Sequence, residues 1–144
     1  MENPKDYGFN SQLIHYSGHH DHYGSATVPI YQTSTFAFES AQDGADCFAG
    51  VKPGYMYTRI GNPTVKALER QIALLEHACD SVAVASGMAA VSTVYLGLLN
   101  AGDHVVSSSA VYGASRVLME QHMSRFGVES TYVNTADIEA VKAA

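Results

Sequence analysis

Short apolar segments alternate with longer helical ones over the second half of the chain, and this alternation limits the possible folds most strongly. In chain order the expected elements are a strand at 81–85, a helix at 88–99, a strand at 104–107, a helix at 113–126, a strand at 128–133 and a last helix that opens at Asp137. A connecting helix brings the next strand back in the same direction. The pattern therefore predicts an α/β fold with a mostly parallel sheet and flanking helices.

A further helix is predicted to begin at Asn62-Pro63, because Asn can accept from free first-turn amides and Pro at the first helical position loses no needed hydrogen bond. Its apolar positions follow at spacings of three and four: Val65, Leu68, Ile72, Leu75 and Cys79. The helix at 113–126 is expected to place Met119, Met123 and Phe126 on one face and to be capped by Gly127. The helix at 88–99 is apolar nearly all round, which predicts a buried helix.

The first 40 residues show no sustained periodicity, yet they are rich in aromatic side chains. A solvated tail seldom carries so many aromatics, so we expect an extended arm that docks on another surface. The aromatic residues are Tyr7, Phe9, Tyr16, Tyr23, Tyr31, Phe36 and Phe38. A short helix is expected at 41–49, followed by loop or extended chain at 50–61.

Charge and cysteine content exclude several classes of partner. The 8 basic and 14 acidic residues give a net charge of −6, with no basic cluster that would favour nucleic acid or an anionic membrane. No apolar run reaches the roughly 18 residues of a spanning helix, and no secretory leader is evident. Cys47 and Cys79 form no CxxC pair, which favours a reducing, cytoplasmic location. The ending Val141-Lys142-Ala143-Ala144 has no helix-stopping residue, so we expect the front part of a longer protein.

The turn after the first predicted strand, at 85–90, is a candidate anion site. Its small residues admit a ligand to the backbone, and the amides that open the next helix can donate to an anion. The same small residues would also permit close packing of helix and strand. The chain has no GxGxxG after the strand, no GxxxxGK[ST] and no GxSxG at Ser86, which removes the main support for nucleotide-binding and serine-hydrolase functions.

Two further segments carry candidate residues. In extended chain Tyr57 and Arg59 would point to the same side, where a phenol and a guanidinium could grip a phosphate; a half-exposed pair on a strand is the alternative. Tyr112 follows the second predicted strand, where its ring could cover a flat ligand or its phenol could move a proton. A core or rim tyrosine is the alternative there.

Histidines and cysteines give no metal prediction. His15, His19, His20 and His22 lack a regular helical or strand frame that would bring three ligands together. Cys47 and Cys79 are interpreted as small buried apolar residues. No metal site is therefore expected.

Taken together, four motifs resemble the Cys/Met-metabolism family of pyridoxal-phosphate (PLP) enzymes, of the aspartate-aminotransferase fold type I. The motifs are Tyr57-Thr58-Arg59-Ile60-Gly61-Asn62-Pro63-Thr64, Ser86-Gly87-Met88-Ala89-Ala90, Asn100-Ala101-Gly102-Asp103-His104-Val105 and Val111-Tyr112-Gly113. The resemblance covers residues 10–144, and 28–36 resembles the family's arm. It implies that residues 1–61 form the arm and a segment contacting the cofactor phosphate, and that 62–144 form the first, truncated part of the PLP-binding large domain.

The resemblance also implies roles for individual residues. Tyr57 and Arg59 would hold the cofactor phosphate of a neighbouring subunit, in a dimer with shared active sites that assembles into a homotetramer. Gly87 and Met88 would donate backbone amides to the phosphate of their own subunit's cofactor. Tyr112 would stack on the pyridine ring and act catalytically in proton transfer.

The implied activity is γ-elimination or γ-replacement on methionine, cystathionine or O-acylhomoserine, as in methionine γ-lyases and O-acetylhomoserine sulfhydrylases. Cystathionine γ-synthase or lyase is the alternative, and a non-catalytic α/β fragment or a nucleotide-binding domain would be a different class. Methionine γ-lyases often have cysteine where this chain has Ala114, whereas the run Cys47-Phe48-Ala49-Gly50 resembles the lyase and sulfhydrylase branches. None of Lys5, Lys52, Lys66 and Lys142 lies in the family's Schiff-base lysine motif, so the 144 residues alone are predicted to be inactive.

Overall fold

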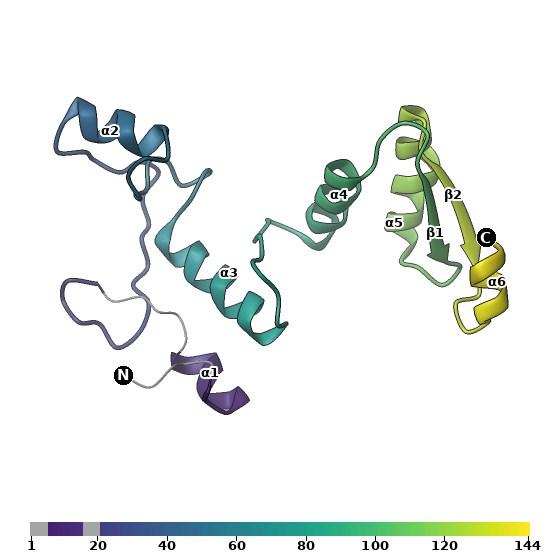
Figure 1. The fold of residues 1–144 in the computed structure, drawn as a ribbon, viewed down its shortest axis with the longest axis horizontal. Coiled ribbons are helices and arrows are strands. Elements are labelled where there is room, and N and C mark those ends of the chain that lie inside the picture. The colour runs from purple at the N-terminus through teal and green to yellow at the C-terminus, as the bar shows by residue number, and fades with distance from the viewer. Residues whose placement is uncertain (1–5, 16–20) are drawn as a thin grey trace. The chain divides into compact units, whose positions relative to one another are not determined.

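The computed structural model describes residues 6–15 and 21–144, which form two compact units, 1–83 and 84–144 (Figure 1). The described residues of the first unit include the α-helices α1 (Phe9–His15), α2 (Ala41–Phe48) and α3 (Pro63–Leu75). The predicted short helix at 41–49 is confirmed as α2, and the side chain of Ser40 caps it by accepting from the amide of Asp43 at 3.1 Å. The predicted division of the chain at residue 61 stays a prediction.

Helix α3 begins as predicted, with Asn62 as N-cap and Pro63 in the first turn, but it ends at Leu75. The backbone then reverses at His77, which has a φ of 53°. Cys79 therefore leaves the face of the helix and is exposed, so its interpretation as a buried residue is wrong, while Cys47 is buried as predicted.

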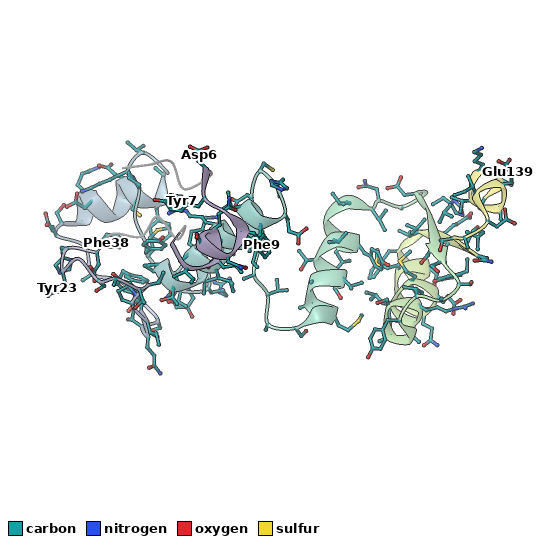
Figure 2. All side chains as sticks on the ribbon, turned by 90° about the horizontal axis from the view of Figure 1, so that it is seen from below. Asp6, Tyr7, Phe9, Tyr23, Phe38 and Glu139 are labelled. Atoms are coloured by element: carbon teal, nitrogen blue, oxygen red, sulfur yellow. The ribbon has the colours of Figure 1, made fainter. Side chains whose placement is uncertain are left out.

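The arm docks over only part of its length. Thr35 pairs with Tyr57 in an isolated antiparallel bridge, and the rings of Phe36 and Tyr55 lie 5.6 Å apart. By contrast, Tyr23 is 84% exposed and Phe9 is 63% exposed (Figure 2). Docking is thus confirmed around residue 35 and not for these two aromatics, and Tyr16 lies outside the described residues.

The strand predicted at 81–85 does not form, because no described residue supplies a neighbouring strand for its backbone groups. Side-chain carboxylates accept from backbone amides of this segment instead of a neighbouring strand. The amide of Ser81 donates to Asp80 at 2.9 Å, and the amide of Ala83 donates to Glu69 at 2.9 Å. The segment belongs to no sheet.

The second unit confirms the predicted α/β pattern. Its elements are α4 (Gly87–Leu98), β1 (His104–Ser108), α5 (Gly113–Val117), the π-helical turn η2 (Leu118–His122), the 3₁₀ turn η3 (Met123–Phe126), β2 (Glu129–Val133) and α6 (Ile138–Ala143). Strands β1 and β2 pair in parallel, in a register that sets His104 beside Glu129 and Ser108 beside Val133 (Figure 1). Asp137 caps α6 as expected.

The core of this unit consists of Met119, Met123 and Val128, which are 1–3% exposed. Phe126 does not share their face and is 64% exposed. The π turn and the 3₁₀ turn change the number of residues per turn, so the periodicity of a regular α-helix does not extend to residue 126.

Helix α4 forms at the predicted position but is not buried in the described chain. None of its residues is buried, and Leu98 is 73% exposed. Only the side carrying Tyr95, together with Leu99 just beyond the helix, packs against the Met119 cluster. The apolar composition predicted the helix correctly, but no described residues cover its other sides.

Gly127 sets the direction in which the chain enters β2. Its φ of 80° is left-handed, and its carbonyl accepts from the amide of Gly102 at 2.8 Å. A Cβ at this position would lie 3.2 Å from the Cβ of Ala101.

We expect Gly127→Ala to destabilise the protein by about 1–2 kcal/mol, because alanine resists the left-handed conformation. Gly127→Asn should cost less, since asparagine adopts this conformation more readily. Thermal unfolding of both variants measures the difference. An equal loss of stability in the two variants would show that the contact with Ala101, and not the left-handed φ, causes the destabilisation.

Candidate functional site

Tyr57 and Arg59 come together through a turn and not through the extended alternation that the sequence predicted. The carbonyl of Tyr57 accepts from the amides of Ile60 at 2.8 Å and Gly61 at 3.0 Å, which closes a turn over residues 58–60. The guanidinium carbon of Arg59 lies 5.5 Å from the centre of the Tyr57 ring. This cation–π contact holds the two side chains on one exposed surface.

The arm completes the surface around this pair. Residues 31–34 and 57–59 line a hollow of about 550 Å³. The amide of Thr58 donates to the carbonyl of Ser34 at 2.9 Å, and the hydroxyl of Thr58 donates to the carbonyl of Thr33. The sequence patterns did not single out Thr33 and Ser34 as site residues, and the only available signal was the resemblance of 28–36 to the family's arm.

Gly87 and Met88 begin helix α4, where the first amides have no carbonyl one turn earlier to accept from them. The hydroxyl of Ser86 accepts from the amide of Ala89 at 3.1 Å and so leaves these two amides to a ligand. No atom lies within 4 Å of the position of a Cβ on Gly87, outside its immediate neighbours. Open space and two helix-opening amides fit an anion such as a phosphate.

Tyr112 lies directly before helix α5 and is 71% exposed, so it is not a core residue of the described chain. The buried hydroxyl of Ser115, in the first turn of α5, lies 3.8 Å from the sulfur of Met88. The beginnings of α4 and α5 are therefore neighbours in the second unit. This neighbourhood brings Tyr112 to the same end of the unit as Gly87 and Met88.

Carboxylates pair with the described lysines. The ammonium group of Lys52 donates to the carboxylate of Asp43 at 2.6 Å, and this hydrogen bond raises the pKa of Lys52. A hydrogen bond to Asp80 likewise raises the pKa of Lys66, and Lys142 pairs with Glu139 at 2.9 Å. Each of these three lysines is therefore paired with a carboxylate, and the raised pKa of Lys52 and Lys66 favours their protonated form, which is not nucleophilic.

Metal ligands do not converge in the part of the chain that the structure describes, where no three His, Cys, Asp or Glu side chains form a cluster. The ring of His22 stacks against Tyr23 with centres 4.0 Å apart. His19, His20 and the side chain of His15 lie outside the described residues. Within those residues, no helix is both long and apolar enough to cross a membrane.

The fold and the donors define a class: an α/β protein whose helix-opening amides, guanidinium and phenols suit a ligand with a phosphate. The chain belongs to the family of Cys/Met metabolism PLP-dependent enzymes, whose model matches residues 10–144.

Relatives and solved structures agree with this family. The chain is 46% identical over 138 residues to the L-methionine gamma-lyase of Fusobacterium nucleatum subsp. polymorphum, covering 96% of this chain and 35% of that protein. It is 40% identical to the O-acetyl-L-homoserine sulfhydrylase of Corynebacterium glutamicum, covering 94% of this chain and 31% of that protein. The crystal structure of metB from Corynebacterium glutamicum matches 99% of this chain and 36% of its own, with a TM-score of 0.87 and 39% identity.

These matches confirm the predicted family and fold class. The chain spans about a third of the length of the curated relatives it matches. A Campylobacter jejuni structure with a TM-score of 0.87 and 29% identity contains N'-pyridoxyl-lysine-5'-monophosphate, in agreement with PLP as the family's cofactor. The donor set of this chain suits the phosphate of that cofactor.

Proposed function

We propose that these 144 residues are the first part of a PLP-dependent enzyme that cleaves sulfur amino acids by γ-elimination, with methionine as substrate. The observation that carries the proposal is the Arg59 guanidinium held over the Tyr57 ring on an exposed turn. The similarity to L-methionine gamma-lyases supports the substrate. A second candidate is γ-replacement on an O-acylhomoserine, favoured by relatives named O-succinylhomoserine and O-acetyl-L-homoserine sulfhydrylase.

PLP supplies the electron sink for this chemistry, and the residues of the chain bind and orient it. Arg59 gives a permanently charged, forked donor and Tyr57 a phenolic hydroxyl, both suited to phosphate oxygens. The amides of Gly87 and Met88 add two neutral donors aligned with the positive end of α4. Tyr112 would cover the pyridine ring, and its phenol would supply a group able to give or take a proton beside the substrate.

We further propose that residues 1–61 form the arm and the phosphate-contacting segment, and that 62–144 begin the PLP-binding large domain. Tyr57 and Arg59 then serve the cofactor of a neighbouring subunit, in a dimer that assembles into a tetramer. The free thiols of Cys47 and Cys79 support a cytoplasmic location.

Assays of the full-length protein with methionine, cystathionine and O-acetylhomoserine test the proposed reaction. With methionine we expect 2-oxobutanoate, ammonia and methanethiol in equal amounts, because water replaces the amino group as the thiol leaves. Faster turnover of O-acetylhomoserine with an added thiol would favour the second candidate. No activity with any of the three would refute the proposal.

Tyr112→Phe should lower kcat by about 100-fold, the usual scale of a lost acid–base group, while retaining the ring that covers the cofactor. PLP affinity should change much less than kcat. Tyr132→Phe is the matched control, because the buried hydroxyl of Tyr132 has no hydrogen-bond partner among the described residues. A Tyr112→Phe enzyme with unchanged kcat would remove Tyr112 from proton transfer.

Arg59→Ala should weaken PLP binding about tenfold or more, since it removes charge-assisted hydrogen bonds to the phosphate. Equilibrium titration of the apoenzyme with PLP measures this loss. Arg125→Ala, which removes the same charge from the exposed end of η3, should leave the affinity unchanged. Equal affinities of Arg59→Ala and wild type would contradict the phosphate role of Arg59.

Mixing inactive subunits tests whether the site is shared. Arg59→Ala subunits combined in equal amounts with subunits that lack the cofactor-binding lysine should regain about a quarter of wild-type activity, because about half of the dimers are mixed and each mixed dimer has one of its two sites intact. Mixed dimers without recovered activity would show that Arg59 serves its own subunit.

A further inference from the structure

Asn62 uses its whole side-chain amide in hydrogen bonds and is only 4% exposed. Its carbonyl oxygen accepts from the amide of Thr64 at 2.9 Å, which is the capping bond of α3. Its nitrogen donates to the carbonyl of Tyr31 at 2.9 Å and to the hydroxyl of Thr58 at 3.1 Å. One buried side chain therefore connects the helix, the arm and the turn that carries Arg59.

Neighbouring side chains fasten the same three segments. The hydroxyl of Thr64 donates to the carbonyl of Pro29 at 2.8 Å and accepts from the amide of Tyr31 at 2.9 Å. The hydroxyl of Thr58 accepts from Asn62 and donates to the carbonyl of Thr33. The arm is thus held at residues 29, 31 and 33 by side chains from the turn and from the start of α3.

Helix capping alone does not require asparagine at this position. Serine and aspartate cap about as well, because a cap uses only the side-chain acceptor. The two donors of Asn62 serve the arm and the turn instead, and neither serine nor aspartate can supply both. A buried polar group with both ends satisfied holds its neighbours in one arrangement, since any other arrangement leaves donors unpaired.

We infer that Asn62 is a positioning residue, which fixes the turn of Tyr57 and Arg59 against the arm so that the pair is preorganised for the cofactor phosphate. The inference rests on the proposed function. Asn62 itself does not contact the cofactor. It acts by holding Thr58, which lies between the two proposed phosphate ligands Tyr57 and Arg59.

The test compares PLP with pyridoxal, which lacks the phosphate, in binding titrations of the full-length apoenzyme. Asn62→Ser keeps a capping oxygen and removes both donors, and Thr58→Val removes the hydroxyl between Asn62 and the arm at nearly equal volume. Asp137→Ser makes the matching change at the cap of α6, which bonds to no arm residue. Arg59→Ala measures how much the guanidinium group itself contributes to binding of the phosphate.

We expect Asn62→Ser and Thr58→Val each to reduce the preference for PLP over pyridoxal about tenfold, while Asp137→Ser leaves it unchanged. A merely structural role would weaken the binding of both compounds equally and leave the preference intact, which would overturn the inference. If Asn62→Ser does not fold, Thr58→Val decides alone. If Arg59→Ala itself keeps the preference, the phosphate role in the proposed function fails, an outcome distinct from failure of Asn62 alone.

Discussion

The buried amide of Asn62 is the interaction on which the first unit depends. It caps α3, donates to the carbonyl of Tyr31 in the arm and donates to the hydroxyl of Thr58 in the turn, so the helix, the arm and the turn share one set of hydrogen bonds. Because all its polar atoms are satisfied away from water, displacing any one segment leaves a buried group unpaired. The exposed pair of Tyr57 and Arg59 owes its geometry to this buried support.

The second unit prepares a site by a different means. The proposed donors are the backbone amides of Gly87 and Met88, which open helix α4. Ser86 satisfies the third amide and leaves the first two available, while Ser115 against Met88 brings the start of α5 alongside. The proposed phosphate donors of the first unit are thus side chains supported by a buried amide, and those of the second unit are the backbone amides that open a helix.

The residues whose predicted environment is wrong depend on partners that a local pattern does not record. Residues 81–85 have strand composition but find no neighbouring strand among the described residues. The apolar spacing places Cys79 on the face of a helix, but that helix ends four residues earlier. It also places Phe126 on the face of a regular helix, but a π turn interrupts that helix. Tyr57 and Arg59 lie together, as the sequence predicts. A turn closed by the Tyr57 carbonyl brings them together, in place of the predicted extended backbone.

The sequence by itself determined the helix starts at Asn62 and Asp137, the glycine cap at Gly127 and the parallel α/β order, because caps, glycine conformation and connection lengths are local properties. Its motifs also identified the family and the candidate phosphate ligands. Only the tertiary structure decided that the donors of Asn62 serve the arm and the turn. Hydrogen bonds between residues 31 positions apart depend on how the chain folds back on itself, which no local pattern records.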